Sequence, residues 1–234
     1  GRTPTLAPVA GESGQTTTSH KSAVKTQKVH TVKRGETLYA IAFNYGLDYR
    51  TVANRNAIAS PYTIYPGQKL FLTGRAPEAT QKKAKKSANQ SIAKTKKKKQ
   101  SPEAVNKDDV TNQPIGDWIW PVKGKLLTSY KASGGKGIDI SGRLGQPVRA
   151  AADGKVVYSG GGLIGYGELI IIKHNKNYLS AYGHNDKLLV KQGDIVKGGQ
   201  QIAAMGHSGT DKVKLHFEIR RDGKPVDPIR YLPK

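Results

Sequence analysis

The residues best suited to chemistry in this sequence are its histidines and carboxylates, because it contains no cysteine. A disulfide framework and a cysteine-based zinc site are therefore impossible, and any metal ion would have to be held by His, Asp or Glu. Among the carboxylates, Asp139 stands between Ile138 and Ile140 on a predicted strand. Because an unpaired charge is costly to bury, this position predicts a partner such as Lys214.

The region around Asp139 is predicted to be rich in strands. From Trp118 onward, short apolar runs such as 169–173 and 215–219 are separated by turn signals such as Asp153-Gly154. The pattern contains no long helical stretch, which argues against an α/β hydrolase or a nucleotide-binding fold. We expect residues 117–234 to form a mainly β domain built on an antiparallel sheet.

A second compact unit is predicted over residues 28–73. Apolar residues recur at helical spacing after Thr37, which can cap a first helix, and Asp48 can cap a second. His30 to Val32 is typical of a short strand, and Pro66-Gly67 forms a turn into a last strand. The expected unit is a small α+β domain in the order strand, helix, helix, strand.

The remaining segments are polar and basic. Residues 1–27 have the composition of a flexible tether, and residues 74–116 that of a lysine-rich linker. The whole chain carries a net charge of +22, which attracts polyanions of any kind. No aromatic residue lies between Phe71 and Trp118 to stack on bases, so we expect a solvated spacer and no specific nucleic acid partner. Binding of the linker to an anionic polymer or lipid remains open.

Two stretches of the first unit carry a family resemblance. "VKRGETLYAIA", beginning at Val32, and "IYPGQKL", beginning at Ile64, closely resemble the LysM family. The resemblance implies binding of glycans that contain N-acetylglucosamine, and hence of peptidoglycan, through two loops. Gly35 and Leu38 have an alternative role in the turn and in the core. The implied glycan-binding residues are Gly35, Glu36, Thr37, Leu38, Ser60, Tyr62 and Ile64.

Several motifs of the β-rich unit resemble the LytM, or lysostaphin-type, zinc endopeptidases: Gly137-Ile138-Asp139-Ile140, Tyr182-Gly183-His184 and Leu215-His216-Phe217-Glu218, among others. Active members bind zinc through an H-x-G-x-D segment and the second histidine of H-x-H. On this resemblance Asp139 and His216 match ligands, and His184 matches a histidine that assists catalysis. Gly135 and Lys214, however, stand where the first ligand and the first histidine of H-x-H belong.

These departures predict a site that is one zinc ligand short, with an ammonium group beside it. We therefore expect no metal cofactor and no catalysis. His216 is then a strand histidine that is hydrogen-bonded within the fold, or a residual ligand, and His184 has a structural role. The expected use of the groove is partner binding without cleavage, through Gly135, Asp139, His184, Lys214 and His216.

The combination of one LysM unit, a lysine-rich linker and such a degenerate domain resembles a group of outer-membrane lipoproteins of Gram-negative bacteria. This resemblance implies activation of an N-acetylmuramoyl-L-alanine amidase during cell separation, in the periplasm. It also implies outer-membrane attachment through an N-terminal lipid that is not part of this sequence, which starts with polar residues unlike a signal peptide. The alternatives are an active zinc endopeptidase and a purely structural wall-binding protein, with a nucleic-acid binder supported by charge alone.

Overall fold

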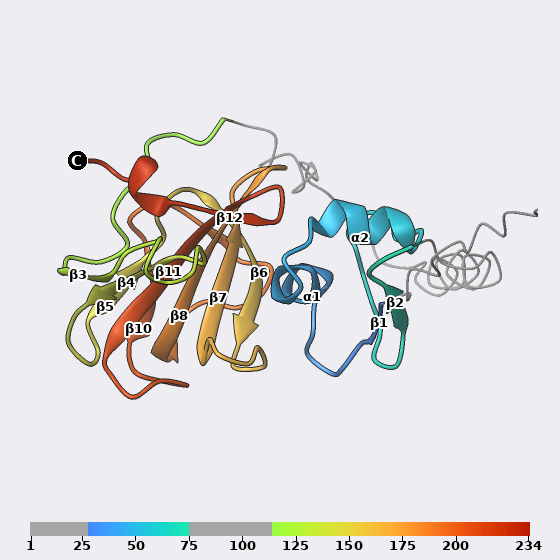
Figure 1. Ribbon diagram of the computed structural model, residues 1–234, viewed down its shortest axis with the longest axis horizontal. Coiled ribbons are helices and arrows are strands. Elements are labelled where there is room, and N and C mark those ends of the chain that lie inside the picture. The colour runs from blue at the N-terminus through green and yellow to red at the C-terminus, as the bar shows by residue number, and fades with distance from the viewer. Residues whose placement is uncertain (1–27, 75–113) are drawn as a thin grey trace, which may run out of the picture.

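A computed structural model describes residues 28–74 and 114–234 in two packed units (Figure 1). The predicted tether and most of the predicted linker lie outside these ranges. The first unit has the predicted order of strand, helix, helix and strand, which is confirmed. Its elements are β1 (Val29–Thr31), α1 (Leu38–Asn44), α2 (Tyr49–Arg55) and β2 (Lys69–Phe71).

The sequence signals for these helices act as predicted. The Thr37 hydroxyl accepts a hydrogen bond from the Ala40 amide at 3.0 Å, and the Asp48 carboxylate accepts one from the Arg50 amide at 2.7 Å. Each cap satisfies an amide that the first turn of a helix leaves without a partner. The strands β1 and β2 pair antiparallel, with Val29 opposite Phe71. The helices therefore start where the sequence predicts, and pack on a two-stranded sheet.

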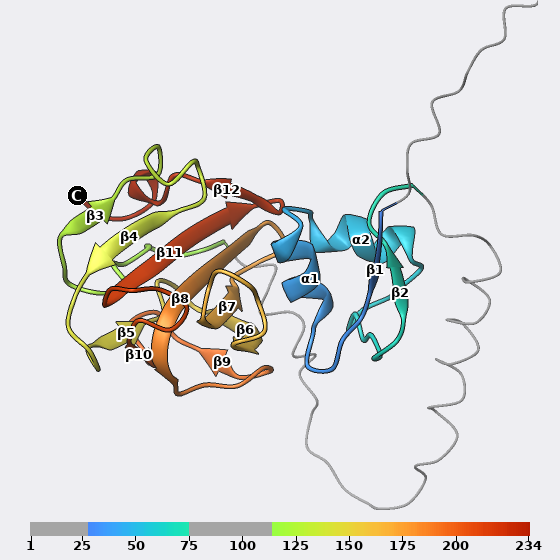
Figure 2. The same ribbon diagram turned by 60° about the horizontal axis from the view of Figure 1, so that its bottom comes forward.

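The second unit is the predicted antiparallel β domain. Its central strands run side by side in the order β3, β4, β11, β8, β7, β6 and β9 (Figure 2). A short 3-10 helix, Pro228–Arg230, follows the last strand. The strands are β3 (Leu126–Thr128), β4 (Ile138–Ser141), β5 (Pro147–Arg149), β6 (Gly154–Gly160), β7 (Glu168–Lys173), β8 (Tyr178–Leu188), β9 (Ile195–Val196), β10 (Gln201–Met205), β11 (Lys214–Arg221) and β12 (Lys224–Val226).

The two faces of this sheet have different roles. On β11, the side chains of Leu215, Phe217 and Ile219 point into the main hydrophobic core. Because side chains alternate along a strand, Lys214, His216, Glu218 and Arg220 lie on the opposite face. That opposite face, which we call the groove face, also carries Asp139 of β4, since Asp139 pairs with His216 in register.

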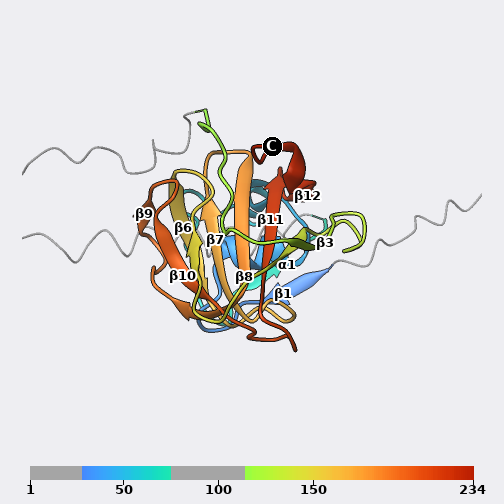
Figure 3. The same ribbon diagram turned by 90° about the vertical axis from the view of Figure 1, so that its left-hand side faces the viewer.

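The first unit packs on the groove face of the sheet. Ala40 and Phe43 of α1 share a buried cluster with Leu169 and Ile171 of β7 and Ala181 of β8. In Figure 1, α1 lies beside β6 and β7, and in Figure 3 it lies behind the sheet. The contact brings residues that are far apart in the sequence into one hydrophobic cluster. Within the described ranges, no helix is long and apolar enough to cross a membrane.

Candidate functional site: a charged cluster on the groove face

Three of the predicted site residues form one cluster of charges. The antiparallel pairing of β4 and β11 places Asp139 beside His216. The Asp139 carboxylate accepts a hydrogen bond from Lys214 Nζ at 2.9 Å through Oδ2 and from His216 Nδ1 at 2.7 Å through Oδ1. The predicted salt bridge between Asp139 and Lys214 is confirmed. The Lys214 side chain is 22% exposed, against 10% for Asp139 and 13% for His216, so it is the most accessible of the three.

The cluster is charged at neutral pH. Burial by itself raises the pKa of Asp139, but the hydrogen bonds from His216 and Lys214 and their positive charges hold it well below its usual range. Burial lowers the pKa of His216, but hydrogen bonds to the carboxylates of Asp139 and Glu218 outweigh this and raise it to about 9. His216 is therefore an imidazolium, and both of its ring nitrogens donate hydrogen bonds.

A second carboxylate extends the cluster along β11. Glu218 is fully buried, and its Oε1 accepts hydrogen bonds from His216 Nε2 at 3.1 Å and from the Tyr166 hydroxyl at 2.8 Å. Its Oε2 accepts a hydrogen bond from Arg220 Nε at 2.7 Å. Burial raises the pKa of Glu218, but His216 and Arg220 hold it below its usual range. Three cations, Lys214, His216 and Arg220, thus lie on one face of β11 and are balanced by the carboxylates of Asp139 and Glu218.

This chain of polar groups ends in the first unit. Arg220 is 4% exposed, its guanidinium donates a hydrogen bond to the Phe43 carbonyl oxygen at 2.5 Å, and its central carbon lies 3.4 Å from the centre of the Phe43 ring. A guanidinium over an aromatic ring is a favourable cation–π contact, and it is stronger away from water. The charged cluster and the docked helix α1 are therefore parts of one continuous buried network.

His184 lies next to this network without bonding to it. Its ring centre is 6.0 Å from that of His216, and its Nδ1 donates a hydrogen bond to the Ser208 carbonyl oxygen at 2.8 Å. Its φ of +64° is unusual for a residue with a side chain. Burial lowers the pKa of His184, so the ring is neutral. The hydrogen bond leaves Nε2 as the ring atom able to accept a proton.

Gly135 has no side chain and so takes no part in the hydrogen bonds of the cluster. It adopts a φ of +76° in the turn before β4, a conformation that favours glycine. A side chain at this position would point at the Tyr130 ring, whose hydroxyl would lie 3.5 Å from the added Cβ. The backbone conformation at this position therefore favours glycine over any residue with a side chain.

The residues present do not fit a zinc ion. Both oxygens of Asp139 and both ring nitrogens of His216 already have hydrogen-bond partners within the protein. Lys214 places an ammonium group against the carboxylate that a cation would need. No group of three or more His, Asp or Glu side chains in the described ranges is arranged to hold a metal ion. The positive charge of Lys214 therefore balances the negative charge of the Asp139 carboxylate.

The predicted glycan-binding residues have mixed surroundings. Leu38 is 1% exposed and belongs to the core of the first unit, while the Thr37 hydroxyl serves as the helix cap. Glu36 accepts hydrogen bonds from the Lys33 amide and from His30. Gly35 is exposed at a φ of +83°, and Ile64 packs against the core. Ser60 and Tyr62 line a cavity between the two units.

Sequence reasoning missed Glu218, Arg220 and Tyr166 as parts of the cluster. A usable signal existed on β11, because the polar residues Lys214, His216, Glu218 and Arg220 follow one another at every second position. Such alternation places four polar side chains on one face of a strand. Nothing local, by contrast, indicates that Phe43 contacts Arg220, since 177 positions separate them.

Comparison with known proteins agrees with this architecture. Residues 30–73 match the LysM domain, and residues 133–228 match Peptidase family M23. The chain thus combines a LysM domain with an M23 peptidase fold. The antimicrobial peptidase lysostaphin from Staphylococcus simulans is 29% identical, with a TM-score of 0.43 over 46% of this chain and 48% of that one.

Two relatives define the family more closely. The "Lipoprotein NlpD/LppB homolog" of Pseudomonas aeruginosa is 46% identical over 97% of this chain and 84% of its own. The "Murein hydrolase activator NlpD" of Escherichia coli is 40% identical over 88% of this chain and 68% of its own. The chain belongs to the NlpD family, some members of which are named murein hydrolase activators.

Proposed function

We propose that this chain is a non-catalytic activator of an N-acetylmuramoyl-L-alanine amidase in cell-wall splitting at division, and that its LysM domain holds it on peptidoglycan. The observation that carries the proposal is the ion cluster of Asp139, Lys214 and His216, residues that the sequence resemblance matches to the zinc-site motifs of active peptidases. A metallopeptidase needs a Lewis acid with a bound water, and this cluster offers neither an open ligand set nor a free carboxylate.

Partner capture would use the groove face. Lys214 is more accessible than Asp139 and His216, and its ammonium can donate further hydrogen bonds to a carboxylate or carbonyl of a partner segment. Ile164 lies in the loop between β6 and β7, two residues before Tyr166. It is 95% exposed and could make an apolar contact with a partner. An amidase segment bound here would shift the amidase toward its open state if that state exposes the segment. Gly135, Asp139, His184, Lys214 and His216 are the proposed lining.

The proposed location follows from the wall-binding domain and from the relatives. The relative from Pseudomonas aeruginosa and a second relative are named lipoproteins, and a third is named an outer membrane antigenic lipoprotein. We propose that this chain works in the periplasm and that its full-length precursor is anchored to the outer membrane by an N-terminal lipid. The LysM domain would then hold the activator where membrane and wall face each other.

The test is an amidase assay on purified sacculi with the full chain and its cognate amidase. We expect the chain to release no product alone and to stimulate the amidase strongly. The variant Lys214→Gln keeps a polar side chain that is one atom shorter and removes its charge, and should lower stimulation by about 10-fold, the loss typical of one charged hydrogen bond. Lys123→Gln, at an exposed lysine outside the cluster, is the matched control.

Two outcomes would overturn the proposal. Cleavage of peptide cross-links by the chain alone, with stoichiometric zinc bound after dialysis, would make it an endopeptidase. Wall binding without any stimulation of an amidase would make it a structural wall-binding protein. Equal stimulation by Lys214→Gln and Lys123→Gln would remove the groove face from the mechanism.

A further inference from the structure

The LysM domain covers the apolar end of the groove face with one side of helix α1. Ala40 and Phe43 are three positions apart and therefore share a side of the helix, and both are buried in a cluster with residues of the M23 domain. The other side of α1, with Leu38 and Ile41, belongs to the core of the LysM domain. A helix that is apolar on both sides needs two apolar surfaces to cover it, and the second is the sheet of the M23 domain.

The sheet has the matching feature on β7. A strand with one face in water alternates between apolar and polar residues, whereas residues 169–172 are four consecutive apolar ones. Ile170 and Ile172 belong to the main core of the M23 domain, and Leu169 and Ile171 lie on the opposite face under α1. Both partners of the contact therefore have apolar surface that their own domain leaves uncovered.

We call the M23 residues under α1 the covered patch, and it borders the charged cluster. Phe43 of α1 lies edge-on against the Tyr166 ring at 5.5 Å, and the Tyr166 hydroxyl bonds to Glu218 of the cluster. Contiguous apolar surface of this kind, once open to solvent, is typical of a site for protein partners. The residues of the covered patch, each at most 6% exposed, are Val157, Leu163, Leu169, Ile171, Leu179 and Ala181.

Polar contacts at the end of β11 hold the LysM domain over this patch. The Arg220 guanidinium donates a hydrogen bond to the Phe43 carbonyl oxygen, and Arg50 of α2 forms an ion pair with Asp222 at 2.8 Å. Arg220 and Asp222 follow closely after His216 on the same strand and its turn. The strand that carries the charged cluster is therefore also the strand that anchors the LysM domain.

The docking is also close at the level of the backbone. Gly223, in the turn between β11 and β12, packs on the turn between α1 and α2, and a Cβ added to Gly223 would overlap the backbone of Leu47 and Asp48. Only a glycine at this position permits the two turns to approach each other so closely. A single substitution there can consequently separate the domains without altering the interior of either one.

We propose that the docked LysM domain is an internal inhibitor of partner binding, because it occupies the covered patch that a partner on the groove face uses once the LysM domain has moved away. The inference rests on the proposed function and adds regulation to that same site. Docking and partner binding compete for one surface. The apparent affinity for the partner is then reduced in proportion to the fraction of chains that are open.

The experiment measures by calorimetry how tightly the N-acetylmuramoyl-L-alanine amidase of the same organism binds full chains that are opened or locked. Gly223→Asn opens the chain, since asparagine tolerates the φ of +80° while its side chain overlaps the LysM backbone. We expect it to bind the amidase about 10-fold more tightly than the wild type, as for a chain that is open about a tenth of the time. Gly145→Asn, at an exposed glycine with a φ of +78° and open space around it, is the matched control.

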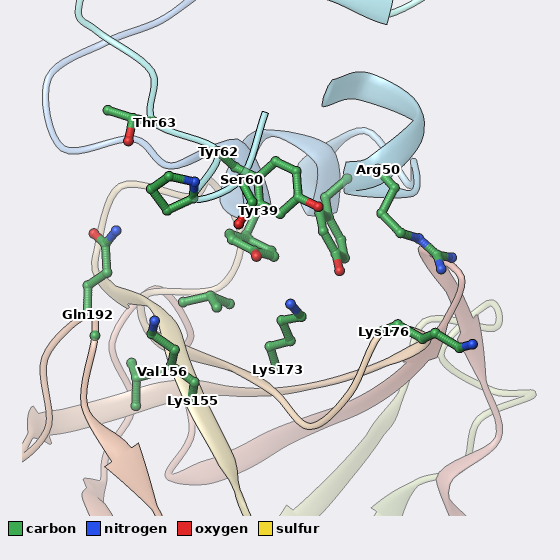
Figure 4. Close-up of a pocket in the computed structure, with 14 residues that line it drawn as sticks. Tyr39, Arg50, Ser60, Tyr62, Thr63, Lys155, Val156, Lys173, Lys176 and Gln192 are labelled. Carbon is green, nitrogen blue, oxygen red and sulfur yellow. The ribbon is translucent and has the colours of Figure 1, made fainter. Parts of the chain in front are cut away.

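A second variant locks the domains together. Thr63 of the LysM domain and Gln192 of the M23 domain are exposed and line the cavity of about 530 Å³ between the domains from its two walls (Figure 4). Because the sequence contains no cysteine, Thr63→Cys with Gln192→Cys supplies the only two thiols, which a short bismaleimide can bridge. The bridged chain should bind the amidase about 10-fold more weakly than the same double variant before bridging, since its open fraction is lost.

Small-angle scattering of the same proteins shows whether the domains are docked. We expect Gly223→Asn to be more extended than the wild type and the bridged chain to be as compact as the wild type, with unchanged circular dichroism in each. Equal affinity of the amidase for the wild type, Gly223→Asn and the bridged chain would overturn the proposal. A wild type as extended as Gly223→Asn would overturn it too, because the LysM domain would then cover nothing.

The stimulation of the amidase by these proteins separates this proposal from the proposed function. If the wild type, the opened variant and the bridged chain all stimulate the amidase equally, the inhibitor proposal fails alone. If even the opened variant neither binds nor stimulates the amidase, the activator proposal fails as well. Stimulation that rises from the bridged chain through the wild type to Gly223→Asn supports both.

Discussion

The two ends of the groove face are used differently although they belong to the same strands. At the Asp139 end, charged side chains balance one another and remain partly accessible to solvent. At the Phe43 end, the sheet is apolar and is covered by a helix of the LysM domain. Glu218 and Arg220 connect the two ends through buried hydrogen bonds. One face of the sheet is thus divided between ion pairing and domain packing.

The largest effect is expected from breaking the charged end. Asp139→Ala would remove the carboxylate that Lys214 and His216 share, and would leave Lys214 without its partner while His216 kept only Glu218. Removing one partner of a buried ion pair destabilises a protein by about 3–5 kcal/mol. Urea unfolding followed by circular dichroism measures the change. Asp211→Ala, at an exposed aspartate, should be nearly neutral, and an equally mild effect of Asp139→Ala would show that the cluster contributes little.

The next effect concerns the covered end. Phe43→Ala would remove an aromatic ring from the cluster between the domains and from the guanidinium of Arg220. A large-to-small change at a buried phenylalanine costs about 3–5 kcal/mol when the space cannot collapse, and two domains that can separate should lose somewhat less. Limited proteolysis and small-angle scattering should report separated domains that are each still folded. Tyr65→Ala, at a half-exposed ring of the LysM domain, should leave the packing intact.

A smaller effect is expected from pH at the charged end. The pKa of His216 is raised from 6.5 to about 9, so its pairing stabilises the fold fully below pH 6.5 and this contribution is lost as the pH rises through 9. Buried His174 behaves in the opposite way, because burial lowers its pKa to about 4 and the ring is neutral in the fold. Protonation of His174 in the unfolded chain should therefore lower stability as the pH falls from 6.5 toward 4.

Unfolding free energies measured from pH 4 to 10 test both signs. His216→Gln should remove most of the loss between pH 6.5 and 9 while leaving the acid limb unchanged. A wild-type curve that is flat above pH 6.5, or one that His216→Gln does not alter, would contradict the raised pKa.

The smallest effect on stability is expected from adding zinc or removing metal with a chelator. Since Lys214 supplies the positive charge beside Asp139, removing metal with a chelator or adding zinc should move the Tm by less than about 1 °C. Lys214→His alone should not create a zinc site, because Gly135 adopts a φ of +76° and a side chain there would point at Tyr130. Thermal melts with and without zinc, together with elemental analysis, check both statements. Stoichiometric zinc in the wild type would contradict the statement that Lys214, and not a metal ion, balances the charge of Asp139.

Much of this protein could be predicted from local sequence. Thr37 and Asp48 cap helices where the sequence placed caps, and the glycine-bounded apolar runs after Trp118 became the strands of one sheet. The prediction that a zinc ligand is missing also needs only the sequence, because it depends on the residue types at Gly135 and Lys214. Caps, turns and alternation act over a few residues, so the sequence alone contains them.

The relations between distant segments were decided by the tertiary structure. The pairing of Asp139 with His216 depends on the register of two strands, and the link from Glu218 through Arg220 to Phe43 depends on how the domains pack. The cavity between Tyr62 and Lys173 has the same origin. No local pattern specifies these contacts, since the first forms only when distant strands pair in one sheet, and the others only when apolar surfaces of the two domains are buried against each other.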